Sequence, residues 1–323
     1  MSSAQFSAEW EPVAEAQRRK DDLTRKAIQL PIDTFRDLPY RAPPLPESCP
    51  VQGQDICITE ETVPVRDGTN IRIRVYRPLS PITSGLLFLN AHGGGFVVGE
   101  PQTEEGQNRI LTKSTNSVTV SVDYRKAPEF PHPYAVNDCF DVLLWCRANA
   151  TSLHIDPERI VVVGGSAGAN LAAVLALKCR DENVSGVIGQ ILNIPVTCHP
   201  TFHPSAKYHL ASYVENESAP VLSSSLMRWF WQQCLPEPTA DPSASPLLAK
   251  SHEELPKALI QVAGCDPLRD EGIAYARALQ EGGVSVDLRV FHGLPHAFYI
   301  HPGLPCTNTY FSNMVDWVKA NFV

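Results

Sequence analysis

The sequence lacks the features that mark membrane-spanning, disulfide-bonded and nucleic-acid-binding proteins. Its apolar runs stay short of the roughly 20 residues that a spanning helix needs. Nine cysteines, an odd number, are scattered singly from Cys49 to Cys306 without a CxxC pair, which indicates reduced core thiols rather than a disulfide framework. Because 27 Lys and Arg face 35 Asp and Glu, a net charge of −8, we expect neither nucleic acid nor a membrane as a partner.

Motifs for a metal, a cofactor or export are also missing. His199 and His203 have the spacing of a helical metal pair, but Pro200 between them prevents the helix. No strand leads into a phosphate-binding or dinucleotide-binding glycine motif. The first residues show no basic and apolar leader. We therefore expect a cytoplasmic protein with no metal and no cofactor.

What is present suits one large α/β domain with additions. The 323 residues, 43% of them hydrophobic and 19% charged, can bury a sizeable core. Residues 8–28 mix charged and apolar side chains as an amphipathic helix does, and several prolines make residues 39–50 a linker. We interpret residues 1–50 as an N-terminal arm that contributes to a cap, and residues 51–323 as the main domain.

Short apolar or β-branched runs alternate with expected helices from about residue 55. Two such runs flank Asp67-Gly68, which predicts a hairpin there. The alternation predicts a mostly parallel sheet with helices on both faces. Residues 198–250 interrupt it with many prolines and the aromatic stretch 226–231, and are expected to form an insertion over the sheet edge. Strands are expected at 63–65, 71–76, 86–89, 118–122, 160–163, 187–194, 259–263 and 286–291, and helices near 103–114, 135–149, 167–180, 270–281 and 309–321.

A candidate nucleophile lies where one of these strands meets a helix. Residues 160–170 read Ile-Val-Val-Val-Gly-Gly-Ser-Ala-Gly-Ala-Asn, a β-branched run, a Gly-x-Ser-x-Gly motif and the start of an Ala-rich helix. A strained turn at Ser166 tolerates no bulk two residues away, and Gly164 and Gly168 meet that demand. A bland glycine turn with an inert serine is the alternative. The strand before the motif and the helix after it favour a nucleophilic Ser166.

A glycine run after an earlier strand is a candidate oxyanion hole. His92 is followed by three glycines, which let the backbone approach a ligand closely. We expect the backbone N–H groups of Gly94, Gly95 and Ala167 to be the donors, with a merely flexible loop as the alternative. His92 precedes the serine, whereas this fold orders its triad as Ser, acid and His, so we assign His92 a structural role in bonding loop backbone.

The acid and the base are sought after the last two strands. Asp266 follows the strand 259–263, and His296 follows the strand 286–291. We expect His296 to accept the serine proton and Asp266 to orient its ring. Rival residues are His292 and the acidic pair Asp270 and Glu271, which we place in the first turn of a helix as partners of its dipole.

Together these blocks resemble the hormone-sensitive-lipase-like, or type IV, esterases of the α/β-hydrolase superfamily. The resemblance runs from about residue 60 to the C-terminus. It implies an α/β-hydrolase fold, with a mostly parallel eight-stranded sheet, helices on both faces, and a helical cap built from the arm and the insertion at about 198–250. The matching stretches are His-Gly-Gly-Gly-Phe at 92–96, Asp-Tyr-Arg-Lys-Ala-Pro-Glu at 123–129 with Ala-Val-Asn-Asp at 135–138, Gly-Gly-Ser-Ala-Gly at 164–168, and Asp-Pro-Leu-Arg-Asp-Glu at 266–271 with His296.

Two positions depart from the family pattern. Gly165 stands where the family usually has Asp, Thr or Glu, and Lys126 stands where it usually has Leu. Neither departure removes a catalytic group, although Gly165 leaves room for a looser elbow and an altered rate. The resemblance further implies that Glu129 is architectural, and that the chain can form a homodimer through its C-terminal strand and helix.

The predicted function is that of a serine carboxylesterase. Its substrate would be a small molecule, either an apolar ester of short to medium chain length or a lactone or ester of a small metabolite, cleaved through an acyl-enzyme. An acyltransferase, cyclase or thioesterase-like enzyme of natural-product synthesis stays open, as does a non-enzymatic receptor, although such receptors can lose the histidine that is present here. Phe96, Trp229 and Phe298 are the leading substrate-binding candidates among a wider aromatic and apolar set whose members could equally pack the core: Phe202, Tyr208, Met227, Phe230 and Trp231.

Overall fold

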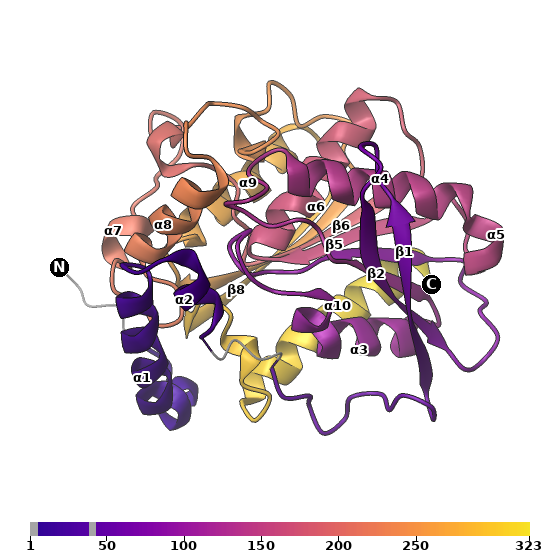
Figure 1. Cartoon of the computed structure of the whole chain (residues 1–323), viewed down its shortest axis with the longest axis horizontal. Helices are drawn as coiled ribbons and strands as arrows, with labels where there is room; N and C mark the ends of the chain where they lie inside the picture. The colour runs from indigo at the N-terminus through magenta and orange to yellow at the C-terminus, as the bar shows by residue number, and fades with distance from the viewer. Residues whose placement is uncertain (1–5, 39–42) are drawn as a thin grey trace.

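An eight-stranded sheet in the order β1-β2-β4-β3-β5-β6-β7-β8 runs through the computed structural model (Figure 1), which describes residues 6–38 and 43–323. β1 and β2 form the predicted hairpin, β2 is also antiparallel to β4, and the other neighbours are parallel. The mostly parallel sheet expected from the sequence is therefore confirmed. The strands are β1 Ile56–Pro64, β2 Asn70–Pro78, β3 Leu87–Ala91, β4 Val118–Val122, β5 Ile160–Gly165, β6 Val187–Asn193, β7 Lys257–Cys265 and β8 Val286–Pro295.

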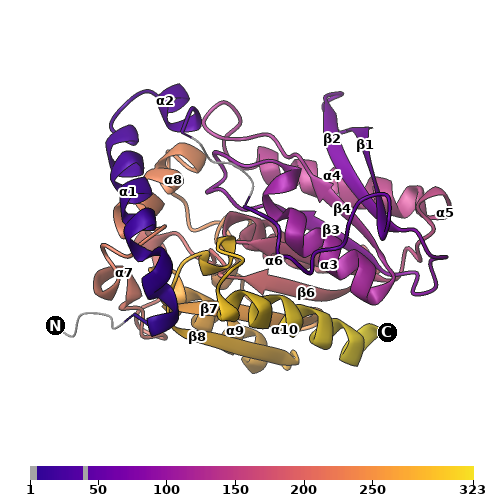
Figure 2. The ribbon, with the colours of Figure 1, turned by 90° about the horizontal axis from the view of Figure 1, so that it is seen from below.

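Helices cover both faces of the sheet. In Figure 2, α3 (Glu105–Thr115) and α10 (Pro305–Phe322) lie on the near face, and α4 (Tyr134–Ala148), α6 (Ala167–Asp181) and α9 (Arg269–Glu281) cover the other. The core is accordingly divided by the sheet. Successive residues of the buried strand β5 point to opposite sides: Val161 and Val163 join the cluster that contains Leu111 of α3, whereas Ile160 and Val162 join the cluster of α4, α6 and α9.

The N-terminal arm lies beside the insertion at one end of the sheet (Figures 1 and 2). α1 (Glu11–Ala27) and α2 (Ile32–Arg36) belong to the arm, and α7 (Ser212–Glu215) and α8 (Ser224–Cys234) belong to the insertion. Asp21 accepts a hydrogen bond from the Val221 amide at 3.1 Å, and the Phe35 ring lies 4.5 Å from that of Trp229. These contacts join the two segments for which we predict a shared role as a cap.

Short elements complete the chain. Each predicted strand and helix is observed, most of them with differences at the ends, and the short helices α2, α5 and α7 were not predicted. β8 continues to Pro295, beyond the expected end at residue 291, so His296 follows the strand directly. No helix in the described part of the chain is long and apolar enough to cross a membrane. The short helices are α5 (Ala150–Leu153) and the 3₁₀ turns Ala8–Trp10, Pro101–Glu104, Pro200–Phe202, Pro246–Leu248 and Phe298–Ile300.

Candidate active site

Ser166 occupies a strained turn between β5 and α6. Its φ of 55° and ψ of −117° lie outside the regions that L-residues ordinarily adopt. A Cβ on Gly164 would come within 2.2 Å of the Gly168 backbone, and a Cβ on Gly168 within 1.9 Å of the Ala91 carbonyl oxygen. Both glycines are therefore sterically required, as the motif predicted, and the turn projects Ser166 from the carboxyl edge of the sheet.

Asp266, His296 and Ser166 form a hydrogen-bonded chain. His296 Nδ1 lies 2.7 Å from Asp266 Oδ2, and His296 Nε2 lies 3.0 Å from Ser166 Oγ. Asp266 also accepts the Leu268 amide at 2.9 Å through Oδ1, which fixes the carboxylate. Since a carboxylate can only accept, the proton of a neutral ring sits on Nδ1, and Nε2 is left to accept from the serine. The structure thus brings together the three residues that the sequence singled out.

The two rival acids, Asp270 and Glu271, form hydrogen bonds with the insertion and not with His296. Asp270 Oδ2 accepts the amides of Ala211 and Ser212 at 2.7 and 2.8 Å. Glu271 Oε1 accepts the Thr197 amide at 2.7 Å, and its Oε2 lies 3.3 Å from His203 Nε2. Both residues are in the first turn of α9, as predicted, but the expected role toward the dipole of that helix was incomplete, because these carboxylates anchor the insertion. The rival base His292 is exposed on β8.

The glycine loop 93–95 adopts backbone angles suited to glycine. φ is 121° at Gly94 and 60° at Gly95, and a Cβ on Gly94 would lie 2.2 Å from the Val98 carbonyl oxygen. Among the described residues, the amides of these two glycines have no protein acceptor. Ala167, the first residue of α6, has no intrahelical acceptor for its own amide because of its position. Three donors are therefore free to bind an anionic oxygen.

His92 has the structural role that we assigned to it. The ring is fully buried, stacks on Tyr124 with centroids 4.3 Å apart, and places Nδ1 2.7 Å from the Gly93 carbonyl oxygen. Tyr124 donates its hydroxyl to the His92 carbonyl at 2.8 Å. Burial lowers the pKa of His92 to about 3, so the ring is neutral and braces the loop.

The residues of the 123–129 block are also structural. Glu129 forms an ion pair with Arg36 of α2 at 2.6 Å, and Arg36 donates to the Ala127 carbonyl at 2.8 Å. Lys126, the second departure from the family pattern, pairs with Asp123 at 2.6 Å. The contacts of Arg36 tie the arm to this block.

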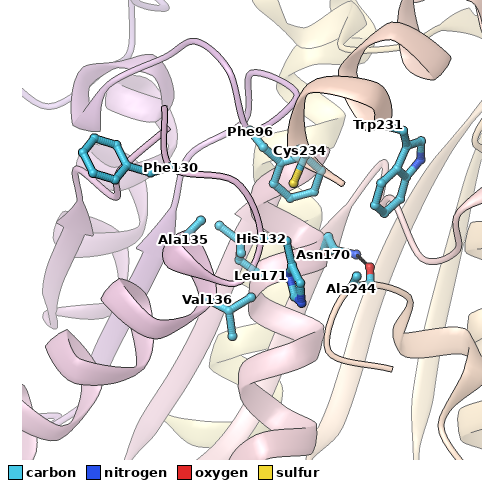
Figure 3. A pocket seen from close by; sticks show the side chains of 10 residues that line it. All are labelled: Phe96, Phe130, His132, Ala135, Val136, Asn170, Leu171, Trp231, Cys234 and Ala244. Atoms are coloured by element: carbon cyan, nitrogen blue, oxygen red, sulfur yellow. Dashed lines mark hydrogen bonds between the residues drawn. The ribbon is translucent and has the colours of Figure 1, made fainter. Parts of the chain in front are cut away.

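The three aromatic substrate-binding candidates do not lie together. Phe96 lines a small apolar cavity near Trp231, between the glycine loop and α6 (Figure 3). Trp229 packs on Phe35 of the arm. Phe298 is fully buried in the core cluster on the α3 and α10 face, where its ring lies 4.7 Å from that of Phe291. Its packing therefore gives Phe298 a core position rather than a place in the cavity.

One buried acidic residue beside the site was missed by sequence analysis. Glu104 is 5% exposed, and its Oε1 accepts the Gly93 amide at 3.2 Å. Nothing in the local pattern marks it, since an acidic residue at the start of a helix is ordinarily exposed. No group of metal-binding side chains is found among the residues that the structure describes.

Comparisons with known proteins agree with this geometry. The chain matches a family model for the α/β-hydrolase fold over residues 88–300. It is 34% identical over 247 residues to an ethyl acetate hydrolase from Pseudomonas putida, covering 75% of this chain and 76% of that one. A hyperthermophilic esterase from Pyrobaculum calidifontis superposes with a TM-score of 0.82 at 32% identity, covering 98% of each chain. A vibralactone cyclase superposes with a TM-score of 0.83 at 29% identity, covering 100% of this chain and 96% of that one. The chain therefore belongs to the hormone-sensitive-lipase-like esterases of the α/β-hydrolase fold and is a carboxylic ester hydrolase.

Proposed function

We propose that Ser166, His296 and Asp266 are the nucleophile, base and acid of this hydrolase. The observation that carries the proposal is the continuous hydrogen-bonded chain from Asp266 through the two ring nitrogens of His296 to Ser166, with distances of 2.7 and 3.0 Å. Nucleophile, base and orienting group in mutual contact are what acyl transfer to a serine requires.

The reaction proceeds in two steps. Ser166 attacks the ester carbonyl as His296 takes its proton, and the oxyanion binds to the amides of Gly94, Gly95 and Ala167. Such donors typically stabilise the transition state by about 3 kcal/mol each. His296 then protonates the departing alcohol, and water, activated by the same ring, releases the acid. Asp266 holds the tautomer and stabilises the imidazolium throughout.

The substrate is an apolar ester whose smaller part enters the cavity beside Phe96. The volume of that cavity is only about 10 Å³, roughly what one water needs, so a short acyl group requires the least rearrangement. We place it next to the site because two of its lining residues are close to the site along the chain: Phe96 follows Gly95, and Asn170 lies one turn beyond Ser166 on α6. The activity named for the Pseudomonas relative, on ethyl acetate, supports the same preference. Its lining is Phe96, Phe130, His132, Ala135, Val136, Asn170, Leu171, Trp231, Cys234 and Ala244.

Acyl transfer or cyclisation is the second candidate function, favoured by the likeness to a vibralactone cyclase. Hydrolysis and transfer share the acyl-enzyme and differ only in the acceptor that attacks it. Product analysis with and without a competing alcohol or amine separates them. Transfer as the main outcome at low acceptor concentration would favour this second candidate.

The proposed triad is tested by comparing the wild type with Ser166→Ala on p-nitrophenyl esters from acetate to laurate. We expect turnover to fall to background in the variant and, in the wild type, to be highest with short chains. Loss of fluorophosphonate labelling in the variant checks the nucleophile. Full turnover by a folded Ser166→Ala protein would refute the assignment, and a laurate optimum would refute the small acyl site.

Homodimer formation is a further part of the proposed function. β8 lies at the edge of the sheet and pairs only with β7 within the described chain. An edge strand offers unpaired backbone groups to a second copy. Size-exclusion chromatography with light scattering tests this, and a monomer at micromolar concentration would contradict it.

A further inference from the structure

A buried carboxyl group lies beside Gly165, the residue before the nucleophile, and next to the glycine loop. Glu104 ends the short turn Pro101–Glu104 that follows the loop, and its side chain is almost completely shielded from solvent. Its Oε1 accepts the amide of Gly93, the first glycine of the loop. Burying a carboxylate costs free energy unless the charge is paired or hydrogen-bonded. A buried acidic residue at this position therefore suggests that Glu104 has a function.

The carboxyl group occupies the place of the missing side chain at Gly165. A Cβ on Gly165 would lie 2.8 Å from Glu104 Oε1 and 2.7 Å from the Tyr299 hydroxyl. A Cβ on Gly93 would lie 3.1 Å from the Gly165 carbonyl oxygen and 3.4 Å from Glu104 Oε1. Glu104 is thus wedged between the loop that carries the amides of Gly94 and Gly95 and the turn that carries Ser166.

Glu104 interacts electrostatically with His296, the proposed base. Burial raises the pKa of Glu104 to about 7, and the hydrogen bond from the Gly93 amide and the positive charge of protonated His296 offset part of that rise. The other titratable groups that sense its charge are the phenols of Tyr124, Tyr299 and Tyr310. In the described part of the chain no lysine or arginine forms an ion pair with Glu104, so the positive charge that acts on it is that of His296.

We propose that Glu104 is a positioning residue for ester hydrolysis, which joins the oxyanion loop to the Ser166 turn and, when ionised, stabilises the imidazolium that forms on His296 during the reaction. This inference rests on the proposed function of the triad. The first effect is mechanical: Oε1 holds the Gly93 amide while the carboxyl group fills the space at Gly165. The second is electrostatic: a negative charge that interacts with His296 stabilises the cation that forms in the transition state.

The electrostatic effect has a definite sign. Burial raises the pKa of Glu104 to about 7, so its carboxyl group is charged above that pH and neutral below it, and the stabilisation that it gives to the transition state is gained as the pH rises through about 7. Glu104→Gln removes the charge while keeping an acceptor for Gly93. We expect kcat of this variant to lack the part of its rise near pH 7 that comes from ionisation of Glu104, so that kcat is lowered severalfold above pH 7 while KM stays nearly unchanged.

The mechanical effect is tested by Glu104→Ala and Gly165→Ala, singly and together. Glu104→Ala should lower kcat at least about tenfold, since small displacements of catalytic groups are costly. Gly165→Ala forces its methyl group against Oε1 in the wild type, but against the Tyr299 hydroxyl alone once Glu104 is truncated. The loss caused by Gly165→Ala should therefore be several times smaller in the Glu104→Ala background.

Glu105→Gln is the matched control. Glu105 is the next residue and is also buried, but its partners are Arg74, Tyr76 and Arg109. This control should lower stability and leave the pH profile in place. Thermal unfolding identifies any variant that does not fold. If Glu104→Ala does not fold, the pH profile of Glu104→Gln alone tests the role of Glu104.

The proposed function and the role of Glu104 are tested by different outcomes. A wild type whose turnover survives Ser166→Ala overturns the proposed function. A wild type with Ser166-dependent turnover, together with folded Glu104→Gln and Glu104→Ala proteins that keep the wild-type kcat below and above pH 7, overturns the role of Glu104 alone. If the losses of kcat caused by Gly165→Ala and Glu104→Ala are additive in the double variant, Glu104 does not pack between the Ser166 turn and the glycine loop in the way proposed.

Discussion

The three glycines around Ser166 exclude side chains for different physical reasons. At Gly164 and Gly168 a Cβ would collide with backbone, at 2.2 and 1.9 Å, and backbone held in a sheet and a helix cannot move aside. At Gly165 it would meet the ends of two side chains, Glu104 and Tyr299. The first two positions follow from the geometry of the turn itself, whereas the third depends on a partner supplied from elsewhere in the chain.

Asp266 and Asp270 provide a paired test at the same residue scale. Asp266→Asn replaces the acceptor of the Nδ1 proton with an amide, which favours the wrong tautomer, and we expect kcat to fall by about three to four orders of magnitude. Asp270→Asn should keep most of the activity and lose about 1–3 kcal/mol of stability, since it weakens two buried bonds to the insertion. Steady-state kinetics and urea unfolding measure the two effects. Equal losses of kcat would contradict the assignment of the acid.

The residues of the proposed triad could be predicted from sequence, and Glu104 could not. Ser166 is identified by the glycines around it and by the strand and helix that flank it. The positions of Asp266 and His296 after the last two strands identify them as the acid and the base. Glu104 depends on the packing of its side chain beneath a turn that is distant along the chain. The sequence suggests that Gly165 loosens the elbow, because the side chain that the family usually has there is missing. In the structure the Glu104 carboxyl group occupies the space of that side chain.

At the scale of elements, local patterns identified helices and strands but not how the arm meets the insertion. β-branched runs and 3.6-residue periodicity are local, so strands such as β5 and helices such as α6 were predicted to within a few residues. The contact between α2 and α8 joins segments that are far apart in sequence, and no periodicity encodes it. Phe35 of α2 is fully buried against α8, where the Phe230 ring in turn covers Gly95.

This contact predicts that Phe35→Ala changes both stability and selectivity. Removing the ring should cost about 3–5 kcal/mol and leave a void beside Trp229 and Phe230. If α8 is held less rigidly, the Phe230 ring that covers Gly95 can move away and leave more room there. The ratio of kcat/KM for long esters to that for short esters should therefore rise. Leu23→Ala, at an exposed position on α1, is the control for mutating the arm and should change neither quantity. A destabilised Phe35→Ala protein with wild-type selectivity would exclude α8 as a determinant of chain length.

At the scale of the whole molecule, strand order explains why one site gathers residues from so much of the chain. Parallel strands with crossover helices place all their carboxyl ends on one edge. β3 delivers the glycine loop there, β5 delivers Ser166, and β7 and β8 deliver Asp266 and His296. This convergence follows from the alternation of strands and helices, and was predictable from it. The packing of both core clusters against this sheet was not, because it depends on side chains meeting across the layers.

The cysteines report on that packing over the entire fold. All nine are free thiols; Cys57 on β1 is exposed and the other eight are buried. Burial raises the pKa of the thiols of Cys179 and Cys306 to about 12, and a buried thiol that is also protonated reacts slowly, because the thiolate is the nucleophile. An aromatic disulfide reagent should therefore titrate one thiol rapidly in the native protein, none in Cys57→Ser, and nine in the wild type after denaturation without reductant. Several fast thiols in the native protein would mean that the core opens readily. Seven after denaturation would reveal a disulfide, and would overturn the reading of these residues as reduced core thiols.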